Sequence, residues 1–251
     1  MNNNTYLAIG KLFFAVAILA IGIIHLVTGH FPAGLLFVDP KFPAASILAY
    51  VNGAVLIIIS LLVFSKKYEY PGACIAAVVW LILLLVVHLP KLITTYNSPS
   101  EWTPTFEVAG IFAGSLILMG NSSIKNNSSR LILIGSYIFA VSIFVFAVLH
   151  LKYLDFIVTL IPAWLPFRLL WAYVVMVAFF AASISLFIRV LVRLATSLLA
   201  LMFFIWFCIL HIPRVVASPH TETEWTSMFV VLIFSGIALL IAGSQSNSVK
   251  V

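Results

Sequence analysis

Residues 75–91 read IAAVVWLILLLVVHLPK, an apolar run that ends at His88 and is followed by Pro90 and Lys91. From Ile75 to Val87 the run contains no charged residue and no small polar residue. It is uninterrupted, whereas the strand of a membrane β-barrel alternates apolar and polar residues. A helix can satisfy all of its own backbone hydrogen bonds inside lipid. The stretch therefore predicts a membrane-spanning helix with a polar end near the bilayer surface.

The whole chain has the composition of a membrane protein. Of its 251 residues, 64% are hydrophobic and 8% are charged, whereas an average soluble domain has about 25% charged residues. A membrane span needs about 20 mainly apolar residues. Eight segments meet this requirement, at roughly 8–29, 44–65, 71–90, 105–120, 131–151, 168–188, 191–212 and 226–243. The predicted fold class is all-α, a polytopic membrane protein whose main partner is the lipid bilayer.

The motif at the end of the opening stretch occurs twice, 123 positions apart. His88-Leu89-Pro90-Lys91 returns as His211-Ile212-Pro213-Arg214, and Glu101-Trp102-Thr103 returns as Glu224-Trp225-Thr226. Such a repeat has to be recognised before a fold is assigned. We predict two four-helix repeats, residues 1–120 and 131–251, joined by a polar linker at 121–130. Because each repeat has an even number of spans, both enter the membrane the same way up and are parallel.

Positive charges set the predicted orientation. The side that holds both termini has more lysine and arginine than the opposite side, and the positive-inside rule then makes both termini cytoplasmic. The net charge of +6 comes from these helix ends and not from a basic patch. We therefore expect no nucleic-acid partner.

The histidines end helices on the opposite, outer side, and His88 and His211 each precede a proline by two residues. Proline leaves the carbonyl four residues back without its donor, so these helix ends should be irregular. Histidine donates, accepts and titrates near neutral pH, and ionisable residues inside a membrane are functional candidates. We predict that His88 and His211 exchange protons and that Glu101 and Glu224 orient them. The alternative is a structural helix end with each histidine bonded to a loop carboxylate.

Other residues on the outer side are candidates for ligand contact. They are the histidines that end the first helix of each repeat, the aromatic residues near the headgroups and the cations after the prolines: His25, His150, Tyr50, Tyr173, Trp164, Trp225, Lys91 and Arg214. Tyrosine and tryptophan at this depth also form the ordinary aromatic belt of membrane proteins, which is their structural alternative.

Four histidines near one face raise the question of haem or a metal. The chain has no Cys-x-x-Cys-His, no His-Glu-x-x-His and no histidine pair at i, i+4. We therefore predict no metal site and rank haem below a quinone, and no cofactor is evident from a motif. Charges inside the spans are nearly absent, which argues against an ion-coupled transporter with carboxylates at the membrane midplane.

The second repeat carries a familiar pattern: Leu149-His150, Asp155-Phe156, Ile161-Pro162-Ala163-Trp164-Leu165-Pro166, Trp171-Ala172-Tyr173 and His211-Ile212-Pro213-Arg214-Val215. This pattern resembles bacterial membrane proteins of the DoxX-like group, whose basic unit is a four-helix bundle. The group takes its name from a membrane subunit of quinone-linked sulfur oxidation. The resemblance implies a bacterial cytoplasmic (inner) membrane location, a quinone ligand and a redox partner protein.

The leading functional hypothesis is an accessory membrane subunit that binds a quinone or a similar apolar ligand near the outer face. The isolated chain is then not expected to be an enzyme. The alternative is a non-catalytic scaffold or assembly protein, in which the histidines are interfacial hydrogen-bonding groups. A third hypothesis, with less support, is a small-molecule or metal permease.

Overall fold

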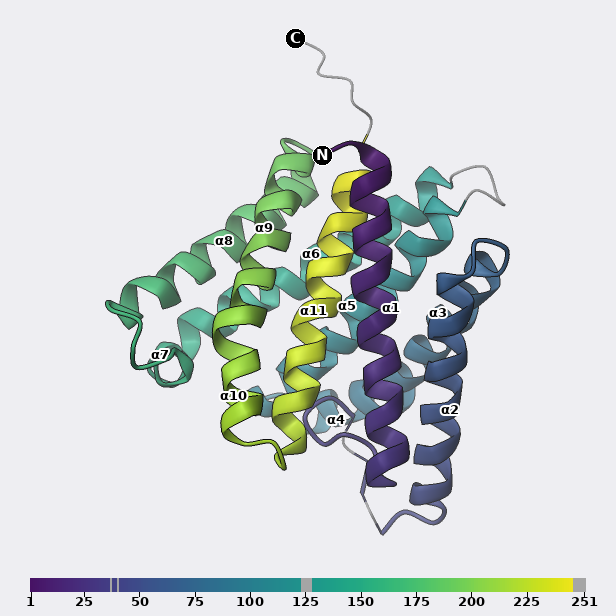
Figure 1. The fold of residues 1–251 in the computed structure, drawn as a ribbon. Coiled ribbons are helices and arrows are strands. Elements are labelled where there is room, and N and C mark those ends of the chain that lie inside the picture. The colour runs from purple at the N-terminus through teal and green to yellow at the C-terminus, as the bar shows by residue number, and fades with distance from the viewer. Residues whose placement is uncertain (37, 40, 123–127, 246–251) are drawn as a thin grey trace.

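The computed structural model describes residues 1–36, 38–39, 41–122 and 128–245, and the chain is 82% helical with no strand in the described part (Figure 1). The first repeat contains α1 (Asn3–Thr28), α2 (Ala45–Phe64), α3 (Glu69–Leu83), the π-helical turn η1 (Leu84–His88), α4 (Leu89–Thr94) and α5 (Pro99–Asn121). The second contains α6 (Ser129–Lys152), α7 (Leu154–Leu160), α8 (Arg168–Ile188), α9 (Val192–Trp206), the π-helical turn η3 (Phe207–His211), α10 (Ile212–Ala217) and α11 (Glu222–Gly243).

Eight of the described helical segments are long and apolar enough to cross a membrane. They are α1, α2, α3 to α4, α5, α6, α8, α9 to α10, and α11. Large apolar side chains such as Val27, Leu61 and Leu201 are exposed on their outer faces, and a continuous apolar surface of this kind needs lipid around it. The chain is an all-α polytopic membrane protein. Most of the predicted linker, at 123–127, lies outside the described residues.

The helix boundaries recur at the spacing of the sequence repeat. α2 and α8, α3 and α9, η1 and η3, and α5 and α11 each begin 123 residues apart. The first helices correspond at a spacing of 125. Ser60 Oγ donates to the Ala15 carbonyl at 2.8 Å, and Ser183 Oγ donates to the Ala140 carbonyl at 3.0 Å. The same interhelical bond therefore occurs once in each repeat.

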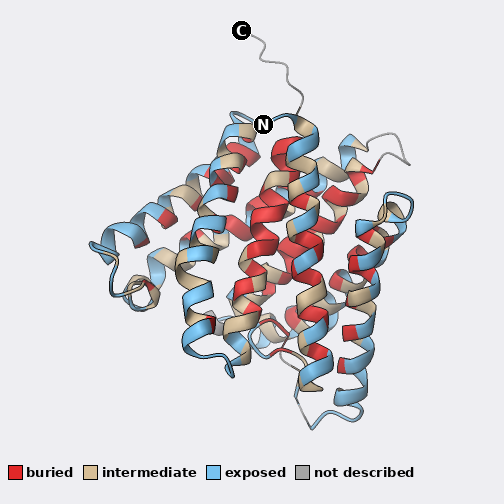
Figure 2. Cartoon of the chain, in the orientation of Figure 1, coloured by how far each residue is buried: buried red, intermediate tan, exposed pale blue. Residues whose placement is uncertain are grey.

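Helices α5 and α11 form the centre of the bundle. In their apolar stretches 61% and 83% of the residues are buried, against 22–44% in the other spans, and Figure 2 shows this burial running along α11. The first helix of each repeat packs on the last helix of the other, α1 on α11 and α6 on α5. At the ends of α5 and α11, Asn121 Nδ2 donates to Ser244 Oγ at 2.8 Å. Because these corresponding positions touch, the two helices end at the same membrane face.

Close approach of α1 to α11 and of α6 to α5 depends on glycine. A Cβ atom added at Gly10 would lie 2.8 Å from the Gly236 carbonyl oxygen, and one added at Gly135 would lie 2.7 Å from the Ala113 carbonyl oxygen. Membrane helices associate through small residues that let their backbones come together. Both repeats have a glycine at this position of their first helix, which indicates that close packing on the last helix of the other repeat requires it in each case.

Replacing Gly10 by alanine is expected to lower the free energy of unfolding by about 1–3 kcal/mol, because the added methyl group overpacks the α1–α11 contact. The loss should appear even though alanine is the better helix former. Gly34→Ala is the matched control, since its added Cβ would lie 3.4 Å from Thr223 Cγ2. Circular dichroism during heating of the protein in lipid nanodiscs measures both. Equal melting temperatures for the two variants would contradict the packing argument.

Candidate functional site

Each His-x-Pro motif begins at the last residue of a π-helical turn. The Leu89 N–H donates to the Leu84 carbonyl, five residues back, and the Ile212 N–H donates to the Phe207 carbonyl in the same way. The proline that follows has no N–H and its ring displaces the carbonyl four residues back, which explains why the helix widens at this point. His88 and His211 are the last residues of these turns. The irregularity predicted from the sequence is present in both repeats, but it lies inside the helix and not at its end, because the helix continues to Thr94 in the first repeat and to Ala217 in the second.

The glutamates of the repeated motifs bind the cations that follow the histidines. Arg214 donates from Nε and Nη2 to the two oxygens of Glu224, both at 2.7 Å. Lys91 Nζ lies 2.9 Å from Glu101 Oε1. Sequence reasoning predicts that each glutamate orients a histidine. In the structure each glutamate contacts the cation that lies three residues after the histidine, and hydrogen bonds between charged groups are the stronger ones. The orienting role of the glutamates stays a prediction.

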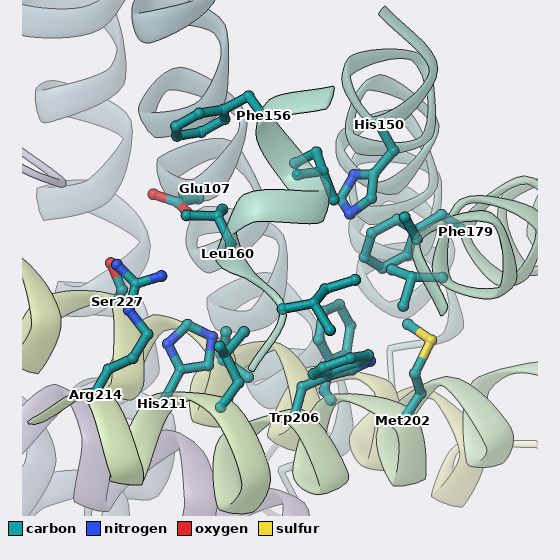
Figure 3. A pocket seen from close by; sticks show the side chains of 17 residues that line it. Glu107, His150, Phe156, Leu160, Phe179, Met202, Trp206, His211, Arg214 and Ser227 are labelled. Atoms are coloured by element: carbon teal, nitrogen blue, oxygen red, sulfur yellow. The ribbon is translucent and has the colours of Figure 1, made fainter. Parts of the chain in front are cut away.

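A cavity of about 390 Å³ lies between α5 and the second repeat (Figure 3). This volume is within the range of small-molecule sites. The walls are mainly apolar and aromatic, with Phe179 from α8, Phe203 and Trp206 from α9, and Phe156 from α7. A second cavity of about 200 Å³ shares several of the same residues, including Phe179 and Phe203. Together they form an apolar space beside the core of the bundle.

Five polar side chains line the larger cavity: Glu107, His150, His211, Arg214 and Ser227. Glu107 comes from the first repeat and the others come from the second, so the site lies between the two repeats. Figure 3 shows His150 and His211 on different sides of the space, with Glu107 across the space from the His150 ring. The Nδ1 atom of His211 is buried and has no hydrogen-bond partner among the described residues.

Glu107 has no equivalent in the other repeat, where the corresponding residue is Val230. Its side chain makes no hydrogen bond or ion pair with any described residue. Because α5 begins at Pro99, Glu107 lies about two turns inside the helix. The sequence prediction starts this helix at 105, which places Glu107 at the membrane surface. For this reason Glu107 is not among the predicted site residues. The available signal was a single acid within an apolar run, which is a functional candidate in a membrane.

His150 and its counterpart His25 make the same hydrogen bond through Nδ1, but they differ at Nε2. Nδ1 of each ring lies 2.8 Å from the carbonyl oxygen four residues back, that of Phe146 or Ile21. A carbonyl can only accept, so Nδ1 carries the hydrogen and the neutral ring has its lone pair on Nε2. Asn52 Nδ2 lies 3.0 Å from His25 Nε2 and can donate to it. No described residue forms a hydrogen bond with Nε2 of His150.

The structure brings three of the predicted site residues together in the cavity: His150, His211 and Arg214. The other predicted residues do not line it: His25, His88, Tyr50, Tyr173, Trp164, Trp225, Lys91, Glu101 and Glu224. Trp225, for example, donates from Nε1 to the Pro219 carbonyl at 2.8 Å, as Trp102 does to Tyr96. Sequence reasoning misses the aromatic wall because a phenylalanine in a membrane helix looks the same whether it faces lipid, core or cavity.

Metal-binding groups and similar proteins give no further indication of the function. Within the described part of the chain, no three His, Cys, Asp or Glu side chains are grouped so as to hold a metal ion. No protein-family model matches the chain, and no curated protein or solved structure matches it. The DoxX-like resemblance therefore stays a prediction, and the functional argument depends on the cavity.

Proposed function

We propose that this integral membrane protein binds a quinone or a similar apolar ring compound in the cavity around His150, His211 and Glu107. The observation that carries the proposal is a mainly apolar and aromatic cavity of about 390 Å³ whose wall also holds the polar side chains of His150, His211 and Glu107. A flat ring is buried well by Phe179, Phe203 and Trp206. The polar groups then contact the oxygens of the ring and fix its orientation.

The side of the cavity that holds His211 is suited to proton exchange with a ligand oxygen. Ser227 offers a hydroxyl donor there, and the Arg214 guanidinium is held in place by Glu224. A histidine with a free ring nitrogen can donate or accept a proton at such an oxygen. In the proposal His211 has this role, whereas His88 lines neither of the two cavities described.

The proposal agrees with the role that the DoxX-like resemblance implies. The chain is then an accessory subunit of a bacterial inner membrane, with both termini cytoplasmic and the cavity toward the outer side. A partner redox protein in the same membrane transfers the electrons, and the isolated chain binds the quinone without oxidising or reducing it. Figure 1 shows α10, which carries Arg214, at the opposite end of the bundle from the start of α1.

Titration of the protein in lipid nanodiscs with tetramethylbenzoquinone tests the proposal, with quenching of tryptophan fluorescence as the signal because Trp206 lines the cavity. Saturable binding is expected. His211→Gln should weaken it about tenfold, the effect of losing about one hydrogen bond. His88→Gln is the matched control and should leave binding unchanged. Absence of saturable binding would reject the proposal and favour the non-catalytic scaffold.

A further inference from the structure

The two repeats contain the same histidine in two different surroundings, and the difference indicates what the cavity binds. In the first repeat His25 is fully buried, and its ring is hydrogen-bonded at both nitrogens, to the Ile21 carbonyl and to the Asn52 amide. In the second repeat His150 keeps the backbone bond to Phe146. The residue that corresponds to Asn52 is Val175, which has no donor.

Val175 lines the same cavity as His150. The place that the Asn52 amide takes beside His25 is therefore filled beside His150 by an apolar side chain and by open space. The Nδ1–H of His150 is already donated to a carbonyl, so the neutral ring presents an acceptor at Nε2. A polar atom facing an apolar cavity without a partner is costly, and a ligand that donates a hydrogen bond would relieve this cost.

Glu107 adds a second acceptor to the cavity wall. A carboxyl group has an oxygen that accepts a hydrogen bond whether or not the group is protonated. Glu107 lines both cavities together with His150, and it has no partner among the described residues. Glu107 and His150 thus offer acceptors to the same space, from opposite sides of it in the view of Figure 3.

We propose that the cavity recognises a hydroxyl group, so that the reduced, O–H-bearing form of a quinone-type ligand binds more tightly than a form without this donor. The inference rests on the proposed function, because it assigns the chemistry of the same site. The ligand hydroxyl takes the place at His150 Nε2 that the Asn52 amide has at His25. Val175 is then the residue that keeps this place free for a ligand.

Two probes of nearly the same shape test the inference: para-pentylphenol, which carries a hydroxyl group, and para-pentylanisole, in which a methyl group replaces its hydrogen. Their dissociation constants are measured by calorimetry with the full chain in lipid nanodiscs. The phenol should bind about tenfold more tightly than the anisole, the difference that about one hydrogen bond makes. Val175→Asn should reduce the difference to less than about twofold, because the new amide donates to His150 internally.

Val175→Leu is the matched control, because leucine has nearly the shape of asparagine and no donor, and it should keep the preference for the phenol. Equal affinity of the unmodified protein for the two probes would overturn the inference and leave the proposed function standing. Binding of neither probe would overturn both. A preference that survives in Val175→Asn would overturn the role given to His150.

Discussion

Replacing Phe203 by tryptophan is expected to abolish ligand binding in a protein that still folds. Phe203 lines both cavities, and its ring packs against Phe179 and Phe234 with centroids 5.6 Å apart in each case. The corresponding residue of the first repeat is Trp80, whose indole ring is fully buried. The architecture therefore accepts an indole at this position, and in the second repeat the extra ring would extend into the cavity.

The expected loss of affinity is more than about a hundredfold, or about 3 kcal/mol of binding free energy. It is measured with the titration proposed for the quinone probe, alongside the melting temperature. Ile205→Trp is the control, because Ile205 is exposed on the outer face of the same helix and gains the same indole without filling the cavity. Full affinity in Phe203→Trp would show that the ligand binds somewhere else.

Much of the fold follows from the sequence alone. The apolar runs locate the eight spans, and the displacement of 123 residues matches helix starts as well as motifs. The starts of α5 and α11, at Pro99 and Glu222, could not be predicted, because the first turns of these two helices are polar and carry the ion-paired glutamates. A hydropathy criterion omits those turns, although tertiary ion pairs and packing keep them helical.

The site could be predicted only in part, for a related reason. His150, His211 and Arg214 belong to motifs with a visible pattern, and they meet in the cavity. The repeat pairs His25 with His150 and His88 with His211, but the structure gives the two members of each pair different surroundings. The difference between Asn52 and Val175 is visible in the sequence as a polar residue against an apolar one, but the sequence does not show which side chain each of them faces. They decide which histidine is satisfied internally, and this is visible only once the contact between α1 and α2 is known.

Replacing Glu107 by valine is expected to stabilise the protein while it weakens binding. The carboxyl group has no partner among the described residues and faces a mainly apolar cavity, and an unpaired buried polar group costs roughly 1–3 kcal/mol in proteins. Valine is the residue that the second repeat has at this position, Val230. We expect a gain of about 1–2 kcal/mol in the free energy of unfolding, since the cavity leaves part of the carboxyl accessible.

Glu101→Val, on the same helix, is the matched control. It should lower the free energy of unfolding, because it removes the carboxylate that lies 2.9 Å from the Lys91 ammonium. Thermal unfolding in nanodiscs measures both variants, and titration with tetramethylhydroquinone, whose two hydroxyl groups can donate to His150 and to Glu107, measures binding. Binding by Glu107→Val should fall about tenfold. A protein that keeps a destabilising acid in one repeat and valine in the other is best explained by use of that acid in binding. If Glu107→Val instead lowered the melting temperature as Glu101→Val does, Glu107 would be a structural residue with a partner in the folded protein, and it would no longer support the proposed site.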